Sequence, residues 1–219
     1  MRALFKVVLT LGAFFTSTFL IAKFAGLFDL GAFQVFVEDL RANGAPTWVG
    51  AAFSALLFAD LFIAVPTLEI SILSGHVLGF APGFGFGLLG VSAAGLAGYG
   101  LSRWKGEVVV RWILRDPAER EDLRATFGAY GVVMIFLSRA LPVLPEVSAC
   151  LAGVTRMPLR RFLLAWWTVN VPYMALATYS GSVSSLQNPF PAIVTAVGLS
   201  VTFWGAWMLF RRRARGRVA

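Results

Sequence analysis

Two prolines, an arginine and a glutamate interrupt an otherwise apolar stretch between residues 138 and 146, which reads Ser-Arg-Ala-Leu-Pro-Val-Leu-Pro-Glu. A continuous membrane helix does not tolerate this stretch, because each proline removes a backbone donor and clashes with the preceding turn. Backbone groups freed in this way are tolerated at membrane depth only where protein or a water-filled cavity satisfies them. A charged residue there costs roughly 2.5–3.5 kcal/mol on insertion scales, so such residues usually face a pathway or a partner.

Composition indicates that this stretch lies in an integral membrane protein. The 219-residue chain is 58% hydrophobic and 14% charged, and its mean hydropathy is +0.76. These values favour one membrane domain over a soluble protein. A single histidine and a single cysteine leave no cluster of metal ligands and no internal disulfide. We therefore expect no metal and no other cofactor, and no nucleic-acid partner although the net charge is +8.

The same pattern occurs a second time, earlier in the chain. Residues 64–70 read Ala-Val-Pro-Thr-Leu-Glu-Ile and resemble residues 140–147 with one residue fewer. Each copy is followed by a glycine, a proline and a long apolar segment; these residues are Gly75 and Pro82 in the first copy, and Gly153 and Pro158 in the second. Repeats built around interrupted helices are typical of transporters, whose site lies between the repeats. The alternative is that proline and glycine only kink ordinary helices.

The apolar runs predict an all-α polytopic membrane protein with about four spanning helices and two re-entrant helical hairpins. The spanning helices are expected at residues 7–28, 83–102, 162–179 and 190–210, and the hairpins at residues 49–80 and 128–154. Residues 29–46 predict a short interfacial helix and loop, and the polar residues 103–127 predict an amphipathic surface segment broken at Asp116-Pro117. Glycines between residues 83 and 98 favour close helix packing.

These predicted elements divide the chain into three parts. Residues 1–48 are expected to form an N-terminal membrane helix, with Lys23 at its far interface, and a linker. Residues 49–182 are expected to form the core with both hairpins. Residues 183–219 are expected to form the last helix and a basic tail.

Basic residues predict the orientation of the chain in the cell (inner) membrane. With the C-terminal arginines in the cytoplasm, 16 of the 19 lysine and arginine residues are cytoplasmic and only Arg41 is outside. Both termini are then cytoplasmic. This assignment requires each hairpin to return to the side from which it came, and the two hairpins to come from opposite sides. The sequence therefore predicts an inverted pair.

Few ionisable residues are expected at membrane depth; they are Asp60, Glu69, Arg139 and Glu146, with His76 nearby. Burial raises the pKa of a carboxyl group and a nearby arginine lowers it, so an acid in this setting can exchange protons near neutral pH. In the functional interpretation, Arg139 holds an anionic group and an acid holds a coupling proton. In the structural alternative, Arg139 pairs with an acid to join the hairpins, and His76 is a packing residue.

Catalysis is not expected. Ser74-Gly75-His76 and Ser138-Arg139 resemble fragments of the membrane phosphatidic-acid phosphatase signature. That chemistry needs a second histidine as nucleophile, and the chain has one histidine. Hydrolysis by Ser74 is equally unsupported, because its side chain and that of His76 do not readily meet on a helix.

The ordered motifs resemble those of the DedA/VTT-domain superfamily, also called the SNARE-associated Golgi protein family, over residues 50–182. The matching elements are Pro66-x-x-Glu69, Gly75, Ser138-Arg139-x-x-Pro142-x-x-Pro145, Gly153-Val154-Thr155 and Phe162. The resemblance implies two facing re-entrant hairpins and lipid handling, as proton-coupled return of undecaprenyl phosphate or as phospholipid scrambling. It implies that Glu69 is the embedded acid and Arg139 the first arginine. Pro145 and Glu146 stand where DedA members have a second arginine, so the sequence is more similar to the yeast-Golgi-type branch.

The leading functional prediction is transport of an anionic lipid or similar amphiphile, a polyprenyl phosphate or a phospholipid, between leaflets, with proton coupling as a further hypothesis. Residues expected to contact the substrate are Arg139, Pro142, Pro145 and Glu146, and those expected to handle the proton are Glu69, Glu146 and Asp60. The alternatives are an uncoupled phospholipid scramblase and a non-transporting scaffold or assembly factor. Membrane lipids are the expected partners, and the sequence allows a homo-oligomer without specifying one.

Overall fold

A computed structural model describes residues 2–63, 65–140, 143–184 and 190–215, apart from residues 25–45, and every regular element in these residues is a helix. In chain order the elements are α1 (Arg2–Phe24), α3 (Pro46–Ala59), α4 (Thr67–Leu78), α5 (Phe80–Ile113), α6 (Pro117–Leu137), η1 (Ser138–Ala140), α7 (Leu144–Val154), α8 (Leu159–Val183) and α9 (Phe190–Arg215). The all-α prediction is confirmed for this part of the chain. Pro142, most of the 29–46 segment, and the side chains of Lys23 and the C-terminal arginines lie outside the described residues.

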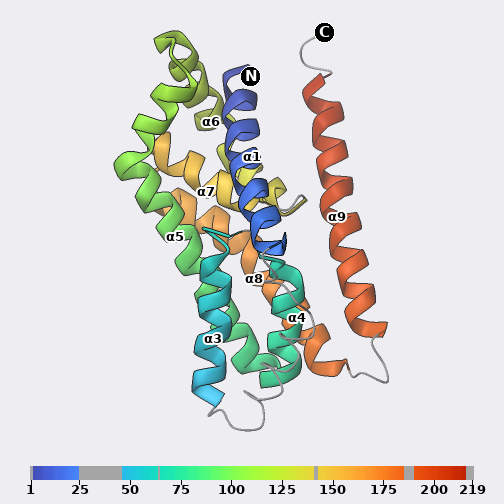
Figure 1. The fold of residues 1–219 in the computed structure, drawn as a ribbon. Coiled ribbons are helices and arrows are strands. Elements are labelled where there is room, and N and C mark those ends of the chain that lie inside the picture. The colour runs from blue at the N-terminus through green and yellow to red at the C-terminus, as the bar shows by residue number, and fades with distance from the viewer. Residues whose placement is uncertain (1, 25–45, 64, 141–142, 185–189, 216–219) are drawn as a thin grey trace.

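Two helix pairs approach the middle of the molecule from opposite ends (Figure 1). In the first pair, α3 and α4 have 14 and 12 residues, so each is about 18–21 Å long at 1.5 Å per residue. Neither length crosses a hydrocarbon core of about 30 Å. In the second pair, α6 comes from the end where α1 begins, and α7 returns toward that end (Figure 1). The arrangement agrees with an inverted pair, while insertion of both pairs into the bilayer stays a prediction.

Prolines mark the helix boundaries as the sequence predicts. Pro66 is the N-cap of α4, Pro145 lies in the first turn of α7, and Pro158 is the N-cap of α8. Proline is tolerated at these positions because the first backbone N–H groups of a helix have no partner within it. Between α4 and α5, Gly79 has φ 82°, a conformation that only glycine adopts readily.

The predicted boundary at residue 103, between a spanning helix and an amphipathic segment, is not observed, and the position of residues 103–127 on the membrane surface stays a prediction. Helix α5 continues through this region to Ile113, and α6 runs from Pro117 into the second pair without a break. Arginine, lysine and glutamate are good helix formers, so a change from apolar to charged sequence does not end a helix. The break at Asp116-Pro117 is confirmed, because the Asp116 carboxylate accepts a 2.9 Å hydrogen bond from the Ala118 N–H at the start of α6.

Among the described residues, one helix is long and apolar enough to cross a membrane by length and composition, and it is α5 with 34 residues. Helices α1, α8 and α9 have 23, 25 and 26 residues. The predicted number of about four spanning helices therefore stays a prediction, as does the three-part division of the chain. The first residue of α1 and the last residue of α9 lie at the same end of the molecule (Figure 1).

Each short return helix packs on the long helix of the other half of the chain. Helix α4 lies against α8, and α7 lies against α5. The contacts are so close that a Cβ atom at Gly75 would overlap with the Thr178 carbonyl, and one at Gly153 would overlap with the Tyr99 carbonyl. Small residues permit this close approach of two backbones. The resulting van der Waals packing drives helix association in a membrane, where burial of apolar side chains away from lipid gives no hydrophobic stabilisation. The two copies of the repeat thus interlock.

The close packing predicted for the glycines of α5 is also confirmed. A Cβ atom at Gly83 would lie 2.8 Å from the Ser74 carbonyl oxygen on α4, and one at Gly90 would lie 2.7 Å from the Ser54 carbonyl oxygen on α3. These glycines of α5 therefore lie on the surface against which the first helix pair packs.

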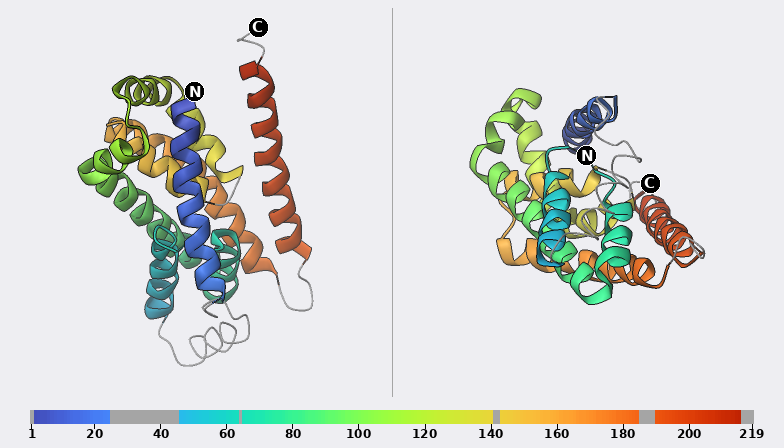
Figure 2. Two further views of the ribbon diagram at one scale, coloured as in Figure 1. Left: turned by 45° about the horizontal axis from the view of Figure 1, so that its top comes forward. Right: turned by 60° about the horizontal axis from the view of Figure 1, so that its bottom comes forward.

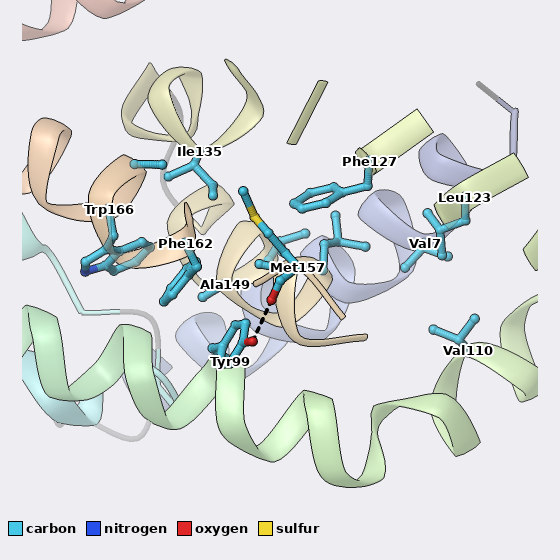
Figure 3. Close-up of a cluster of buried hydrophobic side chains, with 14 of the residues drawn as sticks. Val7, Tyr99, Val110, Leu123, Phe127, Ile135, Ala149, Met157, Phe162 and Trp166 are labelled. Atoms are coloured by element: carbon cyan, nitrogen blue, oxygen red, sulfur yellow. Dashed lines mark hydrogen bonds between the residues drawn. The ribbon is translucent and has the colours of Figure 1, made fainter. Parts of the chain in front are cut away.

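A cluster of buried side chains joins α1 to α5, α6, α7 and α8 (Figure 3). Tyr99 stacks on Phe162 with ring centroids 4.9 Å apart, and its hydroxyl donates a 2.6 Å hydrogen bond to the Met157 carbonyl. Helix α1 contributes Val7, and Lys6 forms an ion pair with Glu119 of α6. These contacts attach the N-terminal helix to the second helix pair.

We predict that Gly75→Ala destabilises the protein, because the methyl group meets backbone that cannot rotate away. Overpacking typically costs about 1–3 kcal/mol. The matched control is Gly85→Ala on α5, where a Cβ atom meets no other atom within 4 Å. This control should be neutral or slightly stabilising. The measurement is the thermal unfolding midpoint of both variants in detergent. Equal midpoints for the two variants would contradict the interlocking of α4 and α8.

Candidate functional site

A cavity of about 680 Å³ lies where the tips of the two helix pairs meet. We refer to it as the central cavity. Its wall comes from both tips and from the flanks of α1, α8 and α9. The residues in its wall are Gly12, Thr16, Asp60, Val65, Pro66, Thr67, Leu68, Glu69, Arg139, Val143, Leu144, Pro145, Glu146, Tyr173, Leu199, Ser200 and Phe203.

The central cavity brings together every described residue of the predicted site. Asp60 and Glu69 come from the first pair, and Arg139, Pro145 and Glu146 come from the second. They converge because Glu69 and Glu146 each lie in the first turn of a return helix, α4 or α7, whose N-terminus is at the tip of its pair. The placement agrees with a site between repeats, and the roles of these residues stay predictions.

Arg139 is held by uncharged partners rather than by an acid. Its guanidinium Nη2 donates a hydrogen bond to Asn170 Oδ1, and its Cζ lies 4.7 Å from the centroid of the Tyr173 ring. Among the described residues, ion pairs join Lys6 to Glu119 and both Arg111 and Arg124 to Glu107, and none involves Arg139. The structural alternative, in which an Arg139–acid pair joins the hairpins, is therefore not observed.

Asn170 and Tyr173 were not predicted as site residues. Both lie on α8, three residues apart and thus on one face of the helix. Asn170 is almost fully buried and also donates a 2.8 Å hydrogen bond to the Trp166 carbonyl. A signal existed in the sequence, because a polar amide in the middle of an apolar membrane helix usually bonds to another helix. The partner itself could not be inferred, because several polar residues were available.

Asp60 shapes the turn at the tip of the first pair. One carboxylate oxygen accepts a 2.7 Å hydrogen bond from the Val65 N–H, and the other accepts a 2.6 Å bond from the Thr67 hydroxyl. These bonds span the turn between α3 and α4 and satisfy backbone that the break at Pro66 leaves without a helical partner. This geometry indicates a structural role for Asp60 at the tip of the first pair.

The two glutamates differ in their surroundings. Glu146 is 8% exposed, and its Oε2 has no hydrogen-bond partner among the described residues. Glu69 is exposed at the wall of the central cavity. A smaller void of about 10 Å³, lined by Asp60, Arg139 and Glu146 among others, lies beside the buried acid. This space is about large enough for one water molecule, and Asp60, Arg139 and Glu146 supply the charged groups of its wall.

The tip of the second pair contains an unusual backbone. Val143 is the N-cap of α7 and has φ 74°, in the left-handed region. This conformation costs a β-branched residue roughly 1–3 kcal/mol and is often found at functional sites. It turns the chain so that Pro145 and Glu146 enter α7 at the wall of the central cavity.

His76 does not belong to this site. It lies near the opposite end of α4, where its Nδ1 is 3.0 Å from the Ser184 carbonyl oxygen at the end of α8. The residue therefore helps to hold α4 to the end of α8, in agreement with the packing alternative.

Comparison with known proteins identifies the family. The family described as the VTT domain matches residues 65–183, which is more than half of the chain. The chain belongs to the VTT domain family. It is also similar to an uncharacterized membrane protein of Synechocystis sp. strain PCC 6803, with 27% identity over 168 residues that cover 69% of this chain and 76% of the relative. No solved structure matches the chain. The family resemblance is confirmed, and the protein is a membrane protein.

The VTT domain contains most of the site. Glu69, Arg139 and Glu146 lie within the matched region, as do Asn170 and Tyr173. Asp60 and the cavity-lining parts of α1 and α9 lie outside it. The wall of the central cavity therefore combines the VTT domain with flanking helices.

We predict that Asp60→Ala destabilises the protein while Asp60→Asn does not. Alanine leaves the Val65 N–H and the Thr67 hydroxyl without their partner, at a cost of roughly 1–3 kcal/mol for each buried group. Asparagine can still accept from the Val65 N–H and can donate to the Thr67 hydroxyl oxygen. The measurement is thermal unfolding in detergent. A wild-type midpoint for Asp60→Ala would contradict the capping role.

Proposed function

We propose that this VTT domain protein is a transporter that moves an anionic lipid or similar amphiphile, such as a polyprenyl phosphate or a phospholipid, between the leaflets of the inner membrane. Both termini would lie in the cytoplasm. The observation that supports this function is the central cavity, whose wall contains an arginine and acids from both copies of an inverted repeat. Transporters with inverted repeats bind their substrates between the repeats, near the bilayer midplane.

Arg139 is the proposed site for the anionic headgroup. Because Asn170 and Tyr173 are uncharged, they position the guanidinium without neutralising it. A guanidinium remains charged at membrane depth and can hold two phosphate oxygens at once. The N-termini of α4 and α7 also lie at the central cavity, and their dipoles favour an anion.

Glu69 and Glu146 are the proposed proton carriers. Glu69 is exposed at the cavity wall and can exchange a proton with water there. Glu146 is buried beside the small void that also contacts Asp60 and Arg139, so a proton on Glu146 would remove a negative charge next to the arginine. Proton binding would thereby strengthen the attraction of Arg139 for an anionic headgroup. Coupling between the two ligands is reciprocal, so headgroup binding would favour proton uptake.

We expect Arg139→Lys to lose translocation although the charge is kept. Lysine is a point charge and cannot form the two parallel hydrogen bonds of a guanidinium. The loss of a charged hydrogen bond costs about 1.5–3 kcal/mol, which corresponds to a roughly 10- to 100-fold slower rate if that bond is strengthened during transport. The measurement is flipping of labelled anionic lipids in proteoliposomes.

Arg111→Lys is the matched control, because Arg111 is an exposed residue on α5 that bonds to Glu107. It should flip lipid at the wild-type rate. Wild-type flipping by Arg139→Lys would reject a bidentate headgroup site, and failure of Arg139→Lys to insert or fold would indicate a purely structural arginine.

We expect Glu69→Gln to abolish the dependence of flipping on a proton gradient while the protein stays folded. Glutamine keeps the size and hydrogen bonding of glutamate but cannot release a proton. The same flipping assay, run with and without an imposed pH gradient, measures the effect. An unchanged gradient dependence would remove Glu69 from the coupling role, and gradient-independent flipping by the wild type would favour an uncoupled scramblase.

A further inference from the structure

Two helices outside the VTT domain complete the wall of the central cavity. Helix α1 contributes Gly12 and Thr16, which are one turn apart, and α9 contributes Leu199, Ser200 and Phe203. Each helix is attached elsewhere in the described structure: α1 packs mainly on α6 and α7, and α9 packs mainly on α8 and η1. Both helices lie at the periphery of the bundle (Figure 2). The cavity wall between them is therefore formed by side chains of two separately anchored helices.

Charge is segregated within the central cavity. Its ionisable residues, Asp60, Glu69, Arg139 and Glu146, come from the tips of the helix pairs. The wall from α1 and α9 contains glycine, leucine, phenylalanine and two hydroxyl residues. The Ser200 hydroxyl donates to the Ala196 carbonyl of its own helix, so its proton is not available to a ligand. One side of the cavity is thus suited to an anionic group and the other to hydrocarbon.

There is also open space beside α1 where Gly12 lies in the wall of the central cavity. A Cβ atom added at Gly12 would meet no other atom within 4 Å. A hydrocarbon chain could therefore pass close to the backbone of α1 at this position. A headgroup bound at Arg139 must remain connected to its chains, and burying those chains among the charged tips would be unfavourable.

We propose that the space between α1 and α9 is a lateral portal, through which the hydrocarbon chains of an anionic amphiphile extend into the bilayer while its headgroup lies at Arg139. This inference rests on the proposed function for the headgroup site, and it adds the route that the hydrocarbon chains of the ligand take. The ligand must have an anionic headgroup on at least one long apolar chain. A water-soluble anion would satisfy Arg139 but would leave the portal without an occupant.

The test uses a fluorophore on one of two faces of α9. Ser200→Cys, in a Cys150→Ala background, carries a bimane label at the cavity wall. Gly198→Cys is the matched control, because it lies at nearly the same depth on a different face and is not part of the cavity wall. Each protein is reconstituted with a small fraction of phosphatidic acid whose acyl chain bears a nitroxide quencher, or with phosphatidylcholine bearing the same chain.

With phosphatidic acid we expect more quenching at residue 200 than at residue 198, because bound chains add to the lipids of the bulk bilayer. With phosphatidylcholine this excess should be absent. The excess with phosphatidic acid should also be lost in Arg139→Gln. Equal quenching at both residues with phosphatidic acid would overturn the portal, as would an excess that persists in Arg139→Gln or that phosphatidylcholine reproduces.

Flipping is measured separately on the unlabelled wild type, so the two proposals can fail independently. Flipping without excess quenching would leave the transport function in place and reject the portal. Excess quenching without flipping would support the portal as a lipid-binding site and reject translocation.

Discussion

Backbone contact between the two halves of the chain places the two return helices, each of which carries a glutamate of the candidate site. Gly75 lets α4 rest directly on α8, and Gly153 lets α7 rest directly on α5. Since α4 and α7 begin at the tips of the helix pairs, these contacts set the depth of Glu69 and Glu146. Lipid supplies no hydrophobic force between helices, so dense packing of small residues takes over that role.

The electrostatic character of the site follows from the same packing. Helix α8 receives α4 on one part of its surface and presents Asn170 and Tyr173 to Arg139 on another. Hydrogen-bond partners that are neutral do not offset the positive charge of an arginine. An acid in an ion pair would offset that charge and so weaken its attraction for an anionic ligand. Desolvation is the cost of this arrangement, and the hydrogen bond and the aromatic ring offset part of it. The net result is a cation that has no ion pair among the described residues and that faces a cavity whose wall also contains acids.

The sequence was sufficient to predict the parts of the fold that depend on local chemistry. Prolines beside acids predicted the two tips, because Pro66 and Pro145 stand at the starts of α4 and α7, where proline is tolerated. The repeat predicted that the tips would meet. The hydrogen-bond partners of the site residues were less predictable. The bond of Arg139 to Asn170 depends on how α8 is rotated about its axis, and hydrophobic periodicity does not define rotation where lipid and protein faces are both apolar.

Tertiary packing also determines where helices end and which residues form the wall of the central cavity, and the sequence alone does not show it. Charge was mistaken for a boundary at residue 103, although helix propensity does not fall there. A structural role of Asp60 could not be predicted either, because a hydrogen bond to the Val65 N–H cannot be inferred from an aspartate five residues earlier. The contributions of α1 and α9 were missed since neither has a distinctive residue at the cavity. Contacts of this kind arise from tertiary packing alone.

Interlocked return helices also restrict how the molecule can move. If one half rocked against the other as a rigid body, α4 would have to slide along α8 and α7 along α5, through contacts in which backbone touches backbone. Packed surfaces of this kind have discrete arrangements and resist gradual shear. A mechanism with a stationary centre and mobile outer helices requires no such sliding. In that case the thickness and tension of the surrounding bilayer, which act directly on peripheral helices, would become inputs to the activity of the protein.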